Sequence, residues 1–81
     1  MKFVCIIKTL PGKISALVEK LKVIEELEGI KIREKLVLFG IPDAVIVFEA
    51  DSETVAGRFL LQLGDVATTK TLLAAEPEKF A

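Results

Sequence analysis

Two short segments carry the side chains best suited to contact a small polar molecule. The turn Gly40-Ile41-Pro42-Asp43 ends in a carboxylate at the start of an apolar run, and Gly40 permits a positive φ or a close approach by another backbone. The segment Thr68-Thr69-Lys70-Thr71 places several hydroxyl groups along one predicted strand. A carboxylate accepts charge-assisted hydrogen bonds, and hydroxyls both donate and accept. Ordinary turn chemistry and strand propensity also account for these two segments.

No catalytic or metal-binding arrangement accompanies them. The chain has no histidine and no tyrosine, so the usual proton shuttles are missing. Ser15 and Ser52 have no neighbouring base, and Pro11-Gly12-Lys13 lacks the glycine spacing and the following Ser or Thr of a phosphate loop. The single cysteine, Cys5, lies in an apolar strand and behaves there as a small hydrophobe. We therefore expect no enzyme, no cofactor and no metal site.

Composition limits the partners of the chain. Its 81 residues are enough for one domain with a barely sufficient core, yet 52% are hydrophobic and the mean hydropathy is +0.53. No apolar run is long enough to cross a membrane, and the first residues do not form a signal peptide, so a cytoplasmic protein without membrane partners is expected. With 11 basic and 12 acidic residues and a net charge of −1, direct DNA binding is not expected. The absence of asparagine and the abundance of Lys and Glu resemble thermophile composition.

The hydropathy pattern repeats one unit of strand, helix, glycine and strand. It predicts strands over residues 2–9, 30–39, 44–50 and 66–75, and helices over about 13–28 and 53–63. The order βαββαβ is that of the α+β, ferredoxin-like fold, in which right-handed crossovers put the first and third strands at the centre of a four-stranded antiparallel sheet. We predict a single domain over residues 1–75 and a short charged tail over residues 76–81.

The central strands are apolar on both faces, although two helices can cover only one face of the sheet. The uncovered face would carry four branched aliphatic side chains, which are Val4, Ile6, Val45 and Val47. A second copy of the chain is the simplest cover for this surface. The sequence therefore predicts self-association through these residues.

Gly40-Ile41-Pro42-Asp43, followed by a strand, a helix and Val66-Ala67-Thr68-Thr69-Lys70-Thr71, resembles the ligand-binding domain of Lrp/AsnC-type regulators. The resemblance covers residues 2–75 and omits that family's N-terminal helix-turn-helix. It implies a dimeric α/β barrel, assembly of dimers into tetramers or octameric rings, and an amino-acid effector bound between dimers. Pro42 stands where the family often has an aromatic residue, and Asp65 where it often has glycine. Small GYD-type proteins of the same dimeric α/β-barrel group are nearly as similar.

The resulting hypothesis is a homo-oligomeric regulatory domain that binds an amino acid or a similar zwitterion and can pair with a full-length Lrp/AsnC-type regulator. Asp43 would receive the ammonium group. Hydroxyls of Thr69 or Thr71, with the turn N–H groups near Gly40 and Ile41, would hold the carboxylate. The first alternative is a dimeric α/β-barrel enzyme, oxygenase-like or isomerase-like, which would need an apolar cavity within the subunit holding a lone acid such as Glu49. The second is a purely structural assembly module.

Overall fold

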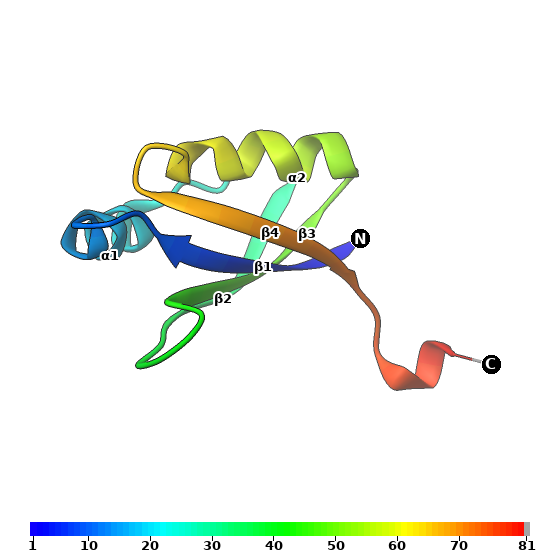
Figure 1. Ribbon diagram of the computed structural model, residues 1–81. Coiled ribbons are helices and arrows are strands. Elements are labelled where there is room, and N and C mark those ends of the chain that lie inside the picture. Colours follow the sequence, from blue (N-terminus) through cyan, green and yellow to red (C-terminus); the bar gives the residue numbers. More distant parts are fainter. Residues whose placement is uncertain (81) are drawn as a thin grey trace.

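The computed structural model of the chain describes residues 1–80, and their elements follow the predicted order βαββαβ (Figure 1). The elements are β1 (Lys2–Thr9), α1 (Ile14–Val23), β2 (Ile30–Val37), β3 (Ala44–Ala50), α2 (Glu53–Leu60), the 3₁₀ turn η1 (Leu61–Leu63), β4 (Ala67–Ala74) and the 3₁₀ turn η2 (Pro77–Lys79). The ferredoxin-like α+β class is therefore confirmed.

The four strands form one antiparallel sheet in the order β2-β3-β1-β4. The two most apolar strands, β1 and β3, lie at the centre, with Phe3 opposite Phe48 and Ile7 opposite Ala44. The strands with interior charges lie at the edges, as the sequence predicted. A register shift at Arg33 interrupts the pairing of β2 with β3, which is typical of a β-bulge at a sheet edge.

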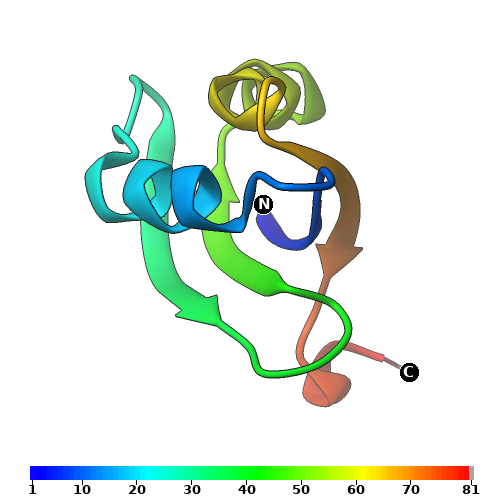
Figure 2. The same ribbon diagram turned by 60° about the vertical axis from the view of Figure 1, so that its left-hand side comes forward.

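Both helices lie against the same face of the sheet (Figures 1 and 2). The core between helices and sheet consists of alternate strand residues and one stripe from each helix. At its centre, the Phe48 ring stacks on Phe3 with a centroid separation of 5.6 Å and meets Phe59 at 4.9 Å. Within residues 1–80, no helix covers the opposite face of the sheet.

The first helix is shorter than predicted, because a side chain from a distant segment forms hydrogen bonds with the backbone that would have continued the helix. The prediction extended it over about residues 13–28, whereas α1 ends at Val23 and Ile24 is already extended. Gln62 donates from Nε2 to the carbonyl of Glu25 at 3.1 Å and accepts from the N–H of Glu25 at 3.2 Å. Both backbone groups of Glu25 are thus satisfied outside a helix.

The predicted helix over residues 13–28 was followed directly by Gly29, but in the structure Gly29 is not at the end of α1 and forms the turn into β2. Its φ is +84°, and an added Cβ would lie 2.8 Å from an Asp51 side-chain oxygen. Glycine is required there both by the backbone conformation and by the close approach. Ser52 caps α2, since its hydroxyl accepts from the N–H of Val55.

The remaining boundaries differ by one to three residues. The strand predicted to reach residue 39 ends at Val37, β4 is one residue shorter at each end than predicted, and the last turn of the second helix is the 3₁₀ turn η1. The predicted tail begins with an ion pair between Lys2 and Glu76 at 2.9 Å and then forms η2. Its final residue, Ala81, lies outside the described residues.

Candidate functional site

Asp43 is held at the rim of the sheet by backbone hydrogen bonds. Its carboxylate accepts from the N–H of Thr9 at 2.8 Å, its N–H donates to the carbonyl of Ile7, and its carbonyl accepts from Leu38. The side chain is partly buried and so joins the end of β1 to the turn between β2 and β3. A carboxylate has about four acceptor positions, so this contact leaves Asp43 able to accept from a ligand.

Gly40 and Ile41 of the predicted turn are exposed, whereas Pro42 is partly buried. Gly40 has φ +152°, and the space around its missing Cβ is empty, so the backbone conformation and not packing favours glycine. The Ile41–Pro42 peptide bond is cis. The side chains of Phe39 and Ile41 are almost completely exposed. The turn therefore carries exposed apolar side chains and exposed backbone groups away from the sheet.

Thr69 and Thr71 lie on β4, opposite Ile7 and Cys5 respectively. Residues paired in an antiparallel sheet share a face, so both threonines point to the helix side. Their hydroxyls lie close to the Cys5 thiol. Burial raises the pKa of Cys5 to about 11, and the hydroxyls of Thr71 and Thr69 oppose that rise. Cys5 is therefore an un-ionised thiol at neutral pH and a poor nucleophile.

Within one subunit, the two predicted halves of the ligand site remain apart. Asp43 precedes β3, whereas the threonines lie on β4, and β1 runs between these strands. The residues were expected to meet at a seam between dimers. A site that used Asp43 together with Thr69 or Thr71 of the same subunit would have to span β1.

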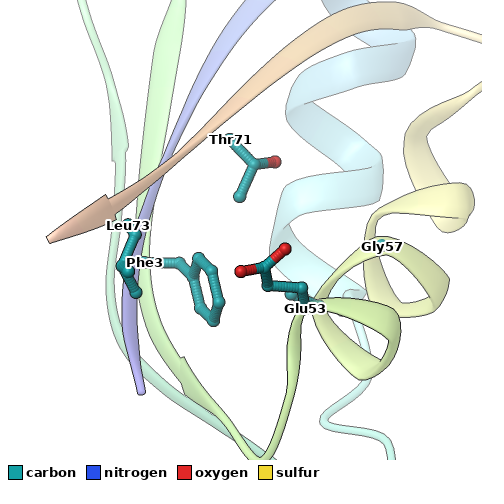
Figure 3. Close-up of a pocket in the computed structure, with 6 residues that line it drawn as sticks. Phe3, Glu53, Gly57, Thr71 and Leu73 are labelled. Carbon is teal, nitrogen blue, oxygen red and sulfur yellow. The ribbon is translucent and has the colours of Figure 1, made fainter.

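Thr71 instead lines a groove within the subunit, between the start of α2 and the edge strand β4 (Figure 3). We call it the α2–β4 groove. Its volume is about 280 Å³, and its lining residues are Phe3, Glu53, Ala56, Gly57, Thr71 and Leu73. Glu53 and Gly57 were not among the site residues predicted from the sequence. The sequence signal that could have pointed to them is a glycine inside the second predicted helix, four positions after an acidic residue.

The helix-free face carries the four predicted aliphatic residues side by side. Val4 pairs with Val47, and Ile6 pairs with Val45, and all four side chains are only half-buried. Two more apolar residues extend the patch to both edges, since Leu36 pairs with Val45 and Leu72 with Val4. Leu36 is 46% exposed and Leu72 is 42% exposed. We call these six residues the helix-free patch.

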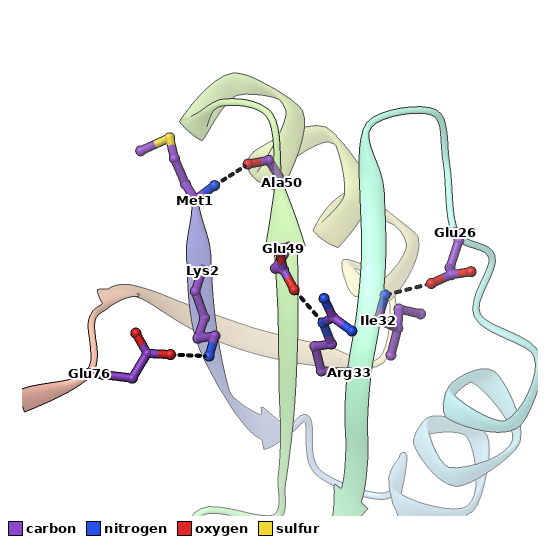
Figure 4. Close-up of polar contacts among 8 residues, drawn as sticks. All are labelled: Met1, Lys2, Glu26, Ile32, Arg33, Glu49, Ala50 and Glu76. Atoms are coloured by element: carbon purple, nitrogen blue, oxygen red, sulfur yellow. Dashed lines mark hydrogen bonds and ion pairs between the residues drawn. The ribbon is translucent and has the colours of Figure 1, made fainter. Parts of the chain in front are cut away.

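Charged residues surround this patch. Glu34 lies at the β2 edge beside Val47, and Lys70 lies at the β4 edge beside Ile6. At one end of the strands, Glu49 pairs with Arg33 (Figure 4). The hydrogen bond from Arg33 lowers the pKa of Glu49. An apolar centre with a charged rim is the usual anatomy of a protein interface.

Glu49 does not meet the requirement set for the enzyme alternative. Its partner Arg33 keeps it ionised, and the hollow that it lines, with Lys31 and Asp51 among its neighbours, lies at the sheet end and not between sheet and helices. Among residues 1–80, no group of three or more His, Cys, Asp or Glu side chains is placed to hold a metal ion. None of the described helices is long and apolar enough to cross a membrane.

No protein-family model matches this chain, and no curated protein matches it. Among solved structures, it is similar to the crystal structure of hypothetical protein PHS023 from Pyrococcus horikoshii, with a TM-score of 0.61 and 20% sequence identity over 99% of this chain and 96% of that one. At this level of identity the similarity supports the fold alone, which the two chains share over almost their whole lengths.

Proposed function

We propose that the protein is a homo-oligomeric regulatory domain that binds a small amino-acid-like molecule, in the manner of an Lrp/AsnC-type effector domain. The observation that carries this proposal is the helix-free patch, an apolar surface across the centre of the sheet that no helix within residues 1–80 covers. A chain of this size that exposes such a surface can bury more apolar area by forming a dimer. The two sheets would then close face to face into a dimeric α/β barrel.

The charges at the patch edges favour one orientation of the two sheets. Glu34 and Lys70 lie at opposite edges of the same face. A two-fold axis parallel to the strands turns the β2 edge of one copy over the β4 edge of the other. Each Glu34 then lies over the β4 edge of the second copy, two residues along the strand from its Lys70, whereas an axis perpendicular to the strands would bring edges of like charge together.

This arrangement can be tested by sedimentation. The wild type should be a dimer or a larger assembly at micromolar concentration, and a well-folded monomer would contradict the proposal. Glu34→Lys should weaken association because it opposes two cations. The double variant Glu34→Lys/Lys70→Glu should restore it, since the pair is only reversed. If the double variant associates as weakly as the single one, the two residues do not face each other.

The proposed effector site combines the Gly40–Asp43 turn with Thr69 and Thr71 from another subunit. Asp43 would receive the ammonium group, and the hydroxyls with the exposed turn N–H groups would hold the carboxylate. The partly buried position of Asp43 supports this role, because its carboxylate is fixed in place by the Thr9 N–H. A fixed acceptor loses little conformational entropy on binding.

A thermal-shift screen of the proteinogenic amino acids, run beside native mass spectrometry, should identify the effector. Asp43→Asn should then weaken binding in calorimetric titration by roughly 10- to 150-fold, the equivalent of one charge-assisted hydrogen bond. The asparagine oxygen still accepts from Thr9, so the fold is retained.

Lys13→Ala serves as control and should bind as the wild type does. Unchanged binding by Asp43→Asn would refute the site. If no zwitterion raises the melting temperature at millimolar concentration, the structural module becomes the better interpretation.

A further inference from the structure

The α2–β4 groove shares Thr71 with the proposed effector site but has no other residue in common with the surfaces used in the proposed function. It lies on the helix side of the sheet, whereas the helix-free patch lies on the other side. It exists because two helices cover four strands incompletely at the β4 edge, where Leu73 remains 61% exposed. Its volume of about 280 Å³ is near the lower end for ligand pockets, so only a small molecule would fit.

Glu53 supplies the charge of the groove. Figure 3 shows its carboxylate directed toward the Phe3 ring and the Thr71 side chain. Among residues 1–80, the Glu53 side chain takes part in none of the ion pairs, which engage Glu19, Glu49, Asp65 and Glu76. Its oxygens are therefore free to accept from a cation in the groove, and the Thr71 hydroxyl offers a further acceptor.

Gly57 is the second, independent indication of a ligand. It lies in the interior of α2, where glycine is less stable than alanine. Its φ is not positive, and an added Cβ would meet no atom within 4 Å, so neither the backbone nor the packing of the subunit requires glycine. The residue does line the groove, and the missing side chain leaves that space open.

The remaining walls are apolar and come from Phe3, Ala56 and Leu73. We propose that the α2–β4 groove binds a small primary ammonium compound with a short alkyl chain. The ammonium group is bound by Glu53 and Thr71, and the chain lies against the apolar walls. Because so few atoms are buried, affinity is in the millimolar range.

The first test is a titration of isotope-labelled protein, followed by two-dimensional NMR. Butylammonium is the test ligand, and butanol and butyrate are matched compounds of similar size without charge and with the opposite charge. Saturable shifts at Glu53, Gly57 and Thr71 are expected with butylammonium, and weaker or no shifts with the other two. Equal responses to all three compounds, or no saturation by butylammonium, would overturn the proposal.

Two variants separate ligand binding from stability. Glu53→Gln should weaken butylammonium binding about fivefold, as expected for an exposed charge pair, while Glu28→Gln, an exposed loop residue, leaves it unchanged. Gly57→Ala should raise the melting temperature by about 4–8 °C because alanine favours the helix. It should also weaken binding, because its methyl group enters the groove. A variant that is more stable but binds equally well would show that the glycine does not serve a ligand.

A negative result for the α2–β4 groove can be distinguished from a negative result for the proposed effector site. Butylammonium has no carboxylate, and Asp43 does not line the α2–β4 groove. Asp43→Asn should therefore bind butylammonium as the wild type does. If Asp43→Asn removes this binding as well, the ammonium group is bound at the turn and the groove assignment is wrong.

Discussion

The two faces of the sheet are built from the same two central strands, yet they differ in what covers them. On the helix side, Cys5, Ile7 and Ile46 have no exposed surface. On the other side, their immediate neighbours Val4, Ile6 and Val45 remain half-exposed. Composition is therefore not what distinguishes the faces, because both carry branched aliphatic residues. The difference is the number of helices, and it indicates that the covered face stabilises the fold whereas the helix-free patch is available for association.

Phe48→Ala should have the largest effect, because it removes the ring at the centre of the covered face. Phe48 has no exposed surface and contacts both Phe3 and Phe59. Truncating a fully buried phenylalanine costs about 3–5 kcal/mol of unfolding free energy. Chemical denaturation followed by circular dichroism would measure it. Val47→Ala, the neighbour on the other face, is the control and should cost much less in the monomer. Equal losses of unfolding free energy in the two variants would mean that the two faces contribute equally to the stability of the monomer.

Val45→Lys should have the next largest effect and should act on association. The lysine would place a charge in the middle of the helix-free patch, where a second copy would bury it without a partner. We expect a loss of about 2–3 kcal/mol of dimerisation free energy with the helix-side core retained. Sedimentation should show more monomer, while circular dichroism shows native secondary structure. An unchanged assembly would mean that association uses another surface.

Removal of one methylene group gives a finer comparison. Ile46→Val on the covered face should cost about 0.5–1.5 kcal/mol at any protein concentration. Ile6→Val on the helix-free patch should show a cost that depends on concentration, because in the proposed dimer its packing would come from a second copy. Thermal melts over a range of concentrations would separate the two. A concentration-independent loss for Ile6→Val would place its packing within the subunit.

The smallest effect concerns pH and the charged rim. The hydrogen bond from Arg33 lowers the pKa of Glu49 below its ordinary 4.5, and Lys2 likewise lowers that of Glu76. Because the folded state binds these protons less readily than the unfolded state, their contribution is present above the unfolded pKa and is lost as pH falls through the folded pKa. Melting temperature should thus fall slightly between about pH 5 and pH 3. The fall should be smaller in Glu49→Gln and at high salt, and an equal fall in the variant would exclude Glu49 as a source.

The proposed effector site was identified only in part from the sequence. The sequence singled out Asp43 by its position at the start of a buried strand. The structure adds the Thr9 N–H, 34 positions away, as its partner. The threonines were identified by their hydroxyls, but their direction toward the helix side follows from pairing with Cys5 and Ile7. A ligand role for these residues remains a prediction.

The sequence by itself determined the element order, the central position of β1 and β3, and the four patch residues of the central strands, whereas Leu36 and Leu72 joined the patch through strand pairing. Apolar periodicity and glycine positions can be recognised from neighbouring residues. The rule that crossovers are right-handed then places β1 and β3 at the centre of the sheet. Tertiary structure alone decided where α1 ends, because Gln62 satisfies the backbone of Glu25 across 37 positions. It also decided the α2–β4 groove, which arises where Glu53 and Gly57 come to face Phe3 and Thr71. Such contacts depend on how elements pack, and no short-range pattern in the chain encodes them.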